Sequence, residues 1–193
     1  MRDTSTTAPS RRRFIALLGA LLLTACATPQ APETQKLDRL LELIGQRLGY
    51  MDDVARNKWN SGAPIEDLPR EREIIESLGK QAAGYGLDAA IARDFFRAQI
   101  EASKIIQRAR FAEWKAQNQP PFRNPPDLRD NIRPGLDALT PELMRALVDA
   151  LPALKSSNTA PLVKERAAAM IRTNDALARD EAIAPLLRVA GHK

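Results

Sequence analysis

A chain of 193 residues, of which 44% are hydrophobic and 5% aromatic, is long enough to bury one core of its own. Its formal charge of +5 does not indicate a nucleic-acid-binding surface, because +3 of it falls in the first 27 residues and only +2 in the rest. Cys26 is the only cysteine and His192 the only histidine, which excludes an internal disulfide, a histidine-based triad and a cysteine–histidine zinc site.

The first 27 residues have the pattern of an export signal. Three arginines at 11–13 precede an apolar run at 14–23, which is too short to cross a bilayer comfortably, and small residues follow it. Residues 10–15 resemble a twin-arginine transport signal, and residues 23–26 resemble a bacterial lipobox, whose cysteine is lipidated after cleavage. We therefore expect a periplasmic or secreted protein, with lipidation of Cys26 and ordinary signal-peptidase cleavage both open.

The next part of the chain, after a short linker expected at residues 28–35, has apolar positions that repeat at helical spacing. A long first helix is predicted over residues 37–59, ending at the breaker at residues 61–64. A second helix is predicted to begin between Ile65 and Pro69 and to end at the glycines of residues 84–86.

A third helix is predicted to follow an N-cap at Asp88 and to extend at least to Phe111. Residues 118–126 are rich in proline and cannot continue it; we expect an extended surface connector in preference to a proline-rich docking motif. Helix resumes near Pro134, and Thr140-Pro141 fits the start of a separate helix.

Two further amphipathic stretches occupy residues 161–189, and nothing in the sequence indicates a strand. The expected fold is therefore all-α. We expect a signal peptide, a linker, a helical catalytic unit and a C-terminal helical extension packed on that unit, at residues 1–27, 28–35, 36–140 and 141–193.

Polar side chains recur at helical spacing on the three helices predicted between residues 36 and 111. Arg47 and Lys58 are eleven residues apart, a rotation of about 1100°, so they return to within about 20° of one helix face. Ser103 and Gln107 form an i, i+4 pair, and Asp67, Arg70 and Glu71 have i, i+3, i+4 spacing. If these faces meet, they enclose a cationic pocket.

The order and spacing of these segments resemble the exported (gamma-class) AroQ-type helical chorismate mutases. The matching segments are Arg47-Leu48 and residues 54–59, 64–67, 70–71 and 95–104, and the likeness continues at Asp127-Leu128 and Ile132-Arg133. It covers residues 36–140 well and the C-terminal part only loosely.

The resemblance implies an isomerase that converts chorismate to prephenate by an intramolecular Claisen rearrangement, with no metal or cofactor. By the same resemblance, Arg47, Arg70 and Arg133 would bind the substrate carboxylates, and Lys58 and Gln107 would flank the ether oxygen. Glu71 would accept a hydrogen bond from the ring hydroxyl, and Ser103 would bind a carboxylate or the hydroxyl region. Asp67 is a weaker candidate for the same wall. The family also implies a homodimer.

Several other residues are expected to lie outside the site. Lys104 and Arg108 are interpreted as solvated charges, as are Arg56 and Arg72, while Trp59, Phe111 and Trp114 are interpreted as core or interface aromatics. Two other functions stay open at this point. One is a non-catalytic helical envelope lipoprotein that uses the scaffold as a binding module, and the other is a membrane-peripheral protein held through lipidated Cys26.

Overall fold

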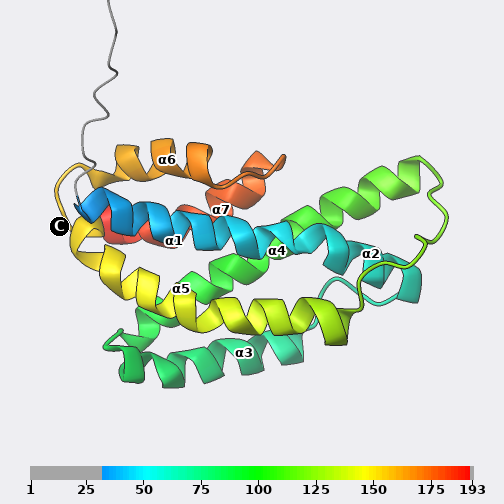
Figure 1. The fold of residues 1–193 in the computed structure, drawn as a ribbon, viewed down its shortest axis with the longest axis horizontal. Coiled ribbons are helices and arrows are strands. Elements are labelled where there is room, and N and C mark those ends of the chain that lie inside the picture. Colours follow the sequence, from blue (N-terminus) through cyan, green and yellow to red (C-terminus); the bar gives the residue numbers. More distant parts are fainter. Residues whose placement is uncertain (1–31, 192–193) are drawn as a thin grey trace, which may run out of the picture.

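The computed structural model describes residues 32–191, and within them every regular element is helical (Figure 1). The predicted signal peptide, Cys26 and His192 lie outside the described residues. The elements are α1 (Pro32–Gly49), α2 (Met51–Ser61), α3 (Leu68–Gln81), the 3₁₀ turn η1 (Ala82–Tyr85), α4 (Ala89–Ala116), the short π-helix η2 (Leu128–Ile132), α5 (Arg133–Leu154), α6 (Thr159–Met170) and α7 (Ala176–Gly191). No helix in this range is long and apolar enough to cross a membrane. The all-α prediction is confirmed.

The predicted first helix is divided into α1 and α2 at Tyr50. The Tyr50 amide donates to the carbonyl of Arg47, three residues back, which tightens the chain at this junction. The Tyr50 ring packs against the backbone of Gly135 on α5, where a Cβ would overlap the ring hydroxyl. The linker prediction was wrong at its end, since residues 32–35 already belong to α1.

The predicted starts of the next two helices are confirmed by their caps, whereas α3 ends at Gln81, before the predicted end, and the 3₁₀ turn η1 continues the chain to Tyr85. The Asp67 carboxylate accepts from the Arg70 amide at the start of α3, and Gly86, with φ of 72°, ends the turn that follows this helix. Asp88 accepts from the amides of Ala90 and Ile91 at the start of α4. These caps fix where the polar faces of α3 and α4 begin.

The prediction of a new helix at Thr140-Pro141 was wrong, because α5 runs without a break from Arg133 to Leu154. Instead of capping a helix, the Thr140 hydroxyl donates to the carbonyl of Leu136 one turn earlier, at 3.0 Å. The expected boundary between residues 140 and 141 therefore falls inside one helix.

The C-terminal helices pack on the part of the fold that carries the polar faces. In Figure 1, α6 lies along α1 at the top, α7 lies between these helices and α4, and α3 occupies the opposite edge. Arg166 of α6 donates to both carboxylate oxygens of Asp38 on α1. The buried Gln99 amide of α4 donates to the carbonyl of Ala182 on α7, at 2.9 Å.

The aromatic residues near the end of α4 form a packed cluster, as expected. The Trp59 ring meets the rings of Phe111 and Trp114 edge-on, with centroids 5.3 and 5.7 Å apart, and Trp114 meets Phe122 at 4.7 Å. Phe122 belongs to the proline-rich connector, and its backbone exchanges two 2.8 Å hydrogen bonds with the Asn60 side chain. The cluster thus fixes α2 and the connector on α4.

Candidate active site

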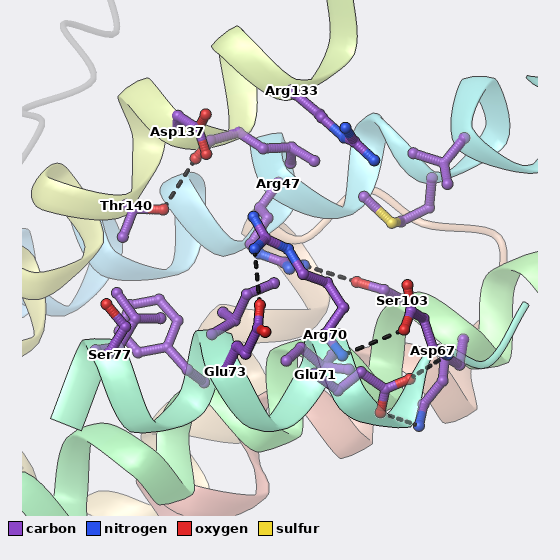
Figure 2. Close-up of a pocket in the computed structure, with 18 of the residues that line it drawn as sticks. Arg47, Asp67, Arg70, Glu71, Glu73, Ser77, Ser103, Arg133, Asp137 and Thr140 are labelled. Carbon is purple, nitrogen blue, oxygen red and sulfur yellow. Dashed lines mark hydrogen bonds and ion pairs between the residues drawn. The ribbon is translucent and has the colours of Figure 1, made fainter. Parts of the chain in front are cut away.

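A cavity of about 880 Å³ lies among α1, α2, α3, α4 and α5, and all seven predicted site residues line it (Figure 2). They are Arg47, Lys58, Arg70, Glu71, Ser103, Gln107 and Arg133. Asp67, the weaker candidate, lines it too. Residues up to 86 positions apart in the sequence therefore converge on one space, as the helical spacing indicated they could.

Arg47, near the end of α1, is a partly buried cation. Its guanidinium donates to the Ser103 hydroxyl at 2.6 Å and to the backbone carbonyl of Gln99 at 3.1 Å. Within residues 32–191 no carboxylate forms an ion pair with it, and burial lowers the pKa of Arg47 to about 10. A partly buried guanidinium that lacks a carboxylate partner makes a favourable position for an anion.

Ser103 and Gln107 face the cavity from successive turns of α4 and are only 5% and 4% exposed. The Ser103 hydroxyl lies between Arg47 and the carbonyl of Gln99, to which it donates at 2.6 Å. The Gln107 amide donates to the Ser103 carbonyl at 3.1 Å, and its buried Oε1 has no hydrogen-bond partner in the described part of the chain. The unused group is therefore an acceptor, while the side-chain nitrogen also contacts Met51 Sδ at 3.9 Å.

Lys58 reaches the cavity from the last turn of α2. Its ammonium donates to the carbonyl of Ile65 at 2.8 Å, a contact made possible by the turn at Gly62, whose φ is 68°. Burial lowers the pKa of Lys58, and the nearby carboxylates, Asp67 first among them, act in the opposite direction. Glu66 does not neutralise Lys58 by direct contact, because it forms an ion pair with Arg108 at 2.6 Å.

Glu71 is held by hydrogen bonds to both of its carboxylate oxygens. Oε1 accepts from the Asp67 amide at 3.1 Å, and Oε2 accepts from the Lys104 ammonium at 2.9 Å. The interpretation of Lys104 as a solvated charge was wrong: Lys104 is 5% exposed, lines the cavity and also pairs with Glu101 at 2.6 Å. Arg108, by contrast, is exposed as expected.

Arg70 and Arg133 are exposed and approach the cavity from opposite sides, α3 and α5 (Figure 2). Arg70 pairs with Glu73 at 3.1 Å, and both of these side chains are well exposed, so the pair is worth little and is free to rearrange. Arg133 is the first residue of α5, and Figure 2 draws it on the same side of the cavity as Arg47.

A second part of the cavity wall was not predicted from the sequence. Ser77, Gln81 and Tyr85 line it from α3 and η1, and Thr140 and Met144 line it from α5. Ser77 and Gln81 repeat the i, i+4 spacing of Ser103 and Gln107, and Thr140 follows Arg133 by seven residues, so helical spacing was a signal that could have found them.

The cavity combines cations and donors with apolar walls formed by residues such as Val54, Ile74 and Phe96. Four cations line it, namely Arg47, Lys58, Arg70 and Arg133, besides the Lys104 that is paired with glutamates. Among residues 32–191 no group of histidine, cysteine and carboxylate side chains is placed to hold a metal ion. The arrangement suits a small dianion with an apolar or ring-shaped body.

Comparisons with known proteins agree with this chemistry. Residues 34–108 match the family model described as chorismate mutase type II. The secreted chorismate mutase of Mycolicibacterium smegmatis is 30% identical over 145 residues, which cover 74% of this chain and 80% of that protein. The secreted chorismate mutase of Yersinia pestis is 32% identical over 125 residues, which cover 65% of this chain and 66% of that protein. Both of these relatives are named as secreted proteins.

Solved structures that resemble this chain are also chorismate mutases. The chorismate mutase of Burkholderia thailandensis superposes with a TM-score of 0.69 and 36% identity, covering 80% of this chain and 99% of that one. The chorismate mutase of Burkholderia phymatum superposes with a TM-score of 0.71 and 30% identity, covering 80% of this chain and 97% of that one. The chain belongs to the type II chorismate mutase family.

Proposed function

We propose that this protein is an exported chorismate mutase that rearranges chorismate to prephenate in the cavity described above. The observation that carries this proposal is Arg47, a partly buried guanidinium held by neutral oxygens and facing a cavity that is also lined by Lys58, Arg70 and Arg133. The substrate carries two carboxylates, so its binding supplies the negative charge that Arg47 lacks.

The first task of the site is to hold a flexible substrate in its folded, reactive conformer. Arg47 binds one carboxylate together with the hydroxyl of Ser103, and Arg70 and Arg133 bind carboxylate groups from the two sides of the cavity. Arg70 must exchange its surface pair with Glu73 for the substrate, which costs little because that pair is exposed. Holding two ends of one molecule in reacting geometry can supply several kcal/mol of the barrier.

The second task is to stabilise the negative charge that grows on the ether oxygen as the C–O bond breaks. Lys58 and Gln107 flank this oxygen. The Gln107 side-chain nitrogen donates to the Ser103 carbonyl and weakly to Met51 Sδ, at 3.9 Å, and turning one N–H from the weaker of these contacts lets it donate to the ether oxygen. Glu71 accepts a hydrogen bond from the ring hydroxyl and so fixes the orientation of the ring. The rearrangement needs no proton transfer or nucleophile, so these groups require no cofactor beside them.

The mature protein is proposed to act outside the cytoplasm after removal of residues 1–27, as a homodimer in which each chain holds a complete site. In the alternative in which Cys26 is lipidated, cleavage would remove residues 1–25 instead, and Cys26 at the new amino terminus would hold the same enzyme on a membrane surface without changing its chemistry.

The proposal is tested by incubating the purified protein with chorismate and following both compounds by ¹H NMR. We expect loss of chorismate and matching formation of prephenate, at a rate proportional to protein concentration. A folded sample that forms no prephenate above the uncatalysed rate would refute the proposal.

A further inference from the structure

Lys104 is a buried cation in the cavity wall that the mechanism above does not use. It follows Ser103 on α4, its side chain is 7% exposed, and its ammonium lies between Glu71 of α3 and Glu101 of α4. The two contacts differ in surroundings, because the Glu71 side chain is 16% exposed and that of Glu101 is 41% exposed. The contact with Glu71 is therefore the one shielded from water.

The contacts of Glu71 show what Lys104 does for it. The backbone amide of Asp67 fixes Oε1 and Lys104 fixes Oε2, so the carboxylate is held at both ends. Each oxygen keeps a further lone pair for a ligand donor. Without Lys104, one oxygen would lose its partner and the carboxylate could rotate away from the position in which it meets the substrate.

Charge gives Lys104 a second effect on the cavity. Burial lowers the pKa of Lys104, but its hydrogen bonds to Glu101 and Glu71 outweigh burial and leave the pKa raised, so the ammonium stays charged. The other charged groups near this pair are Lys58 on α2, Asp67 and Glu66 before α3, and Arg108 on α4, which is occupied by Glu66. Lys104 is thus the direct cationic partner of Glu71, and its loss would leave a bare carboxylate facing a dianionic ligand.

We propose that Lys104 is a positioning residue for Glu71: it fixes the carboxylate that receives the substrate's ring hydroxyl and cancels its charge. This inference rests on the proposed function, since it concerns the same ligand. The competing explanation is that Lys104 only ties α4 to α3 as part of the fold.

A double-mutant cycle separates these two roles. Lys104→Met, Glu71→Gln and the combined variant are compared with the unaltered protein in KM, kcat and the Kd of prephenate, measured by calorimetry. Prephenate carries two carboxylates and a ring hydroxyl, so its binding reports on the site without turnover. Glu101→Gln is the matched control, because it removes the other partner of Lys104 and leaves Glu71 in place. Lys104→Arg tests rescue.

Lys104→Met is expected to raise KM and the Kd of prephenate about tenfold, as for loss of one charged hydrogen bond, with a smaller change in kcat. In the Glu71→Gln variant, the further change Lys104→Met should raise the Kd of prephenate less than about threefold, because the side chain at position 71 is already neutral. Glu101→Gln should alter Kd by less than about threefold, and Lys104→Arg should restore most of the lost affinity.

If Lys104→Met weakens prephenate binding by the same factor with Glu71 and with Gln at position 71, the positioning role is wrong. It is also wrong if Glu101→Gln weakens prephenate binding as much as Lys104→Met does. If Lys104→Met does not fold, as judged by circular dichroism, Lys104→Gln carries the same cycle. Absence of prephenate formation by the unaltered protein would refute the proposed function, whereas normal turnover with additive losses would refute only the role of Lys104.

Discussion

The Arg47 guanidinium lies 2.6 Å from the Ser103 hydroxyl, and both side chains face the cavity without an ion-pair partner among the described residues. The contact joins α1 to α4 across 56 positions of sequence. It presents a partly buried cation and a neutral hydrogen-bonding group to a ligand.

Replacing Arg47 by methionine should separate activity from stability. The lowering of the Arg47 pKa to about 10 corresponds to about 3 kcal/mol by which burial disfavours the charge, offset in part by two hydrogen bonds. We therefore expect kcat/KM to fall at least a hundredfold while the free energy of unfolding stays the same or rises by up to about 2 kcal/mol. Urea denaturation and steady-state kinetics measure the two effects. A loss of more than about 1 kcal/mol would show that Arg47 supports the fold instead.

Lys58 should affect the chemical step more than it affects binding. A donor aimed at developing charge in a water-poor site contributes about 3 to 4 kcal/mol, so Lys58→Ala should lower kcat by a hundredfold or more. Lys155, an exposed lysine at the end of α5, offers the matched control, and Lys155→Ala should leave kcat within about twofold. If Lys58→Ala raises KM alone, Lys58 binds ground state and transition state equally and does not stabilise the ether oxygen.

The helix caps and the polar spacing could be read from the sequence because both are local. Asp88 caps the start of α4 because an aspartate before a helical run accepts from the first free amides. The eleven-residue interval between Arg47 and Lys58 places both in one cavity, even though the helix is interrupted at Tyr50 between them. The roles of these residues came from the family resemblance, since spacing shows only that side chains can meet.

Other features depend on contacts that no local pattern records. Lys104 is buried because Glu71, 33 positions earlier, approaches it from another helix, whereas by sequence it is one more charge beside Ser103. Pro141 lies inside α5, and packing of the whole helix keeps it continuous there. A Thr-Pro pair fits both the start of a helix and this interior position, so the sequence alone does not distinguish them. The cavity wall formed by Ser77, Gln81 and Tyr85 was missed although these residues are four positions apart, because that spacing does not show that their face of the helix meets the cavity.

The pH profile should be flat through neutrality and fall only in alkali. Gln107 donates hydrogen bonds without titrating, so activity should persist between about pH 5 and 7, and a steep loss there would contradict its role. Arg47 and Lys58 act when protonated, and burial lowers the pKa of each, that of Arg47 to about 10. As pH rises toward 10, kcat/KM should therefore decline. The decline in kcat should come at higher pH, because the bound dianion stabilises the protonated forms of Arg47 and Lys58.

The variant Gln107→Glu provides the comparison for that profile. A glutamate must be protonated to donate a hydrogen bond, so its activity should increase as pH falls. Identical profiles for Gln107→Glu and the unaltered protein would show that residue 107 does not donate to the substrate.

Gly135 should be required for the position of Arg133. A Cβ at residue 135 would overlap the Tyr50 hydroxyl, so Gly135→Ala forces α5 or the ring to move and should cost about 1 to 3 kcal/mol of stability. KM should rise as well, because Arg133 lies two residues away at the start of the same helix. Gly84→Ala is the matched control, since a Cβ there meets nothing within 4 Å and the residue needs no positive φ. Equal effects of the two substitutions would show that the contact with Tyr50 is unimportant.

The most direct test of the function compares the unaltered protein with Arg47→Met in one ¹H NMR time course of chorismate, at equal protein concentration and in the presence of EDTA. We expect stoichiometric conversion to prephenate by the unaltered protein and almost none above the uncatalysed rate by the folded variant. Equal rates for the two proteins would contradict catalysis in this cavity, and no conversion by either would contradict the function itself.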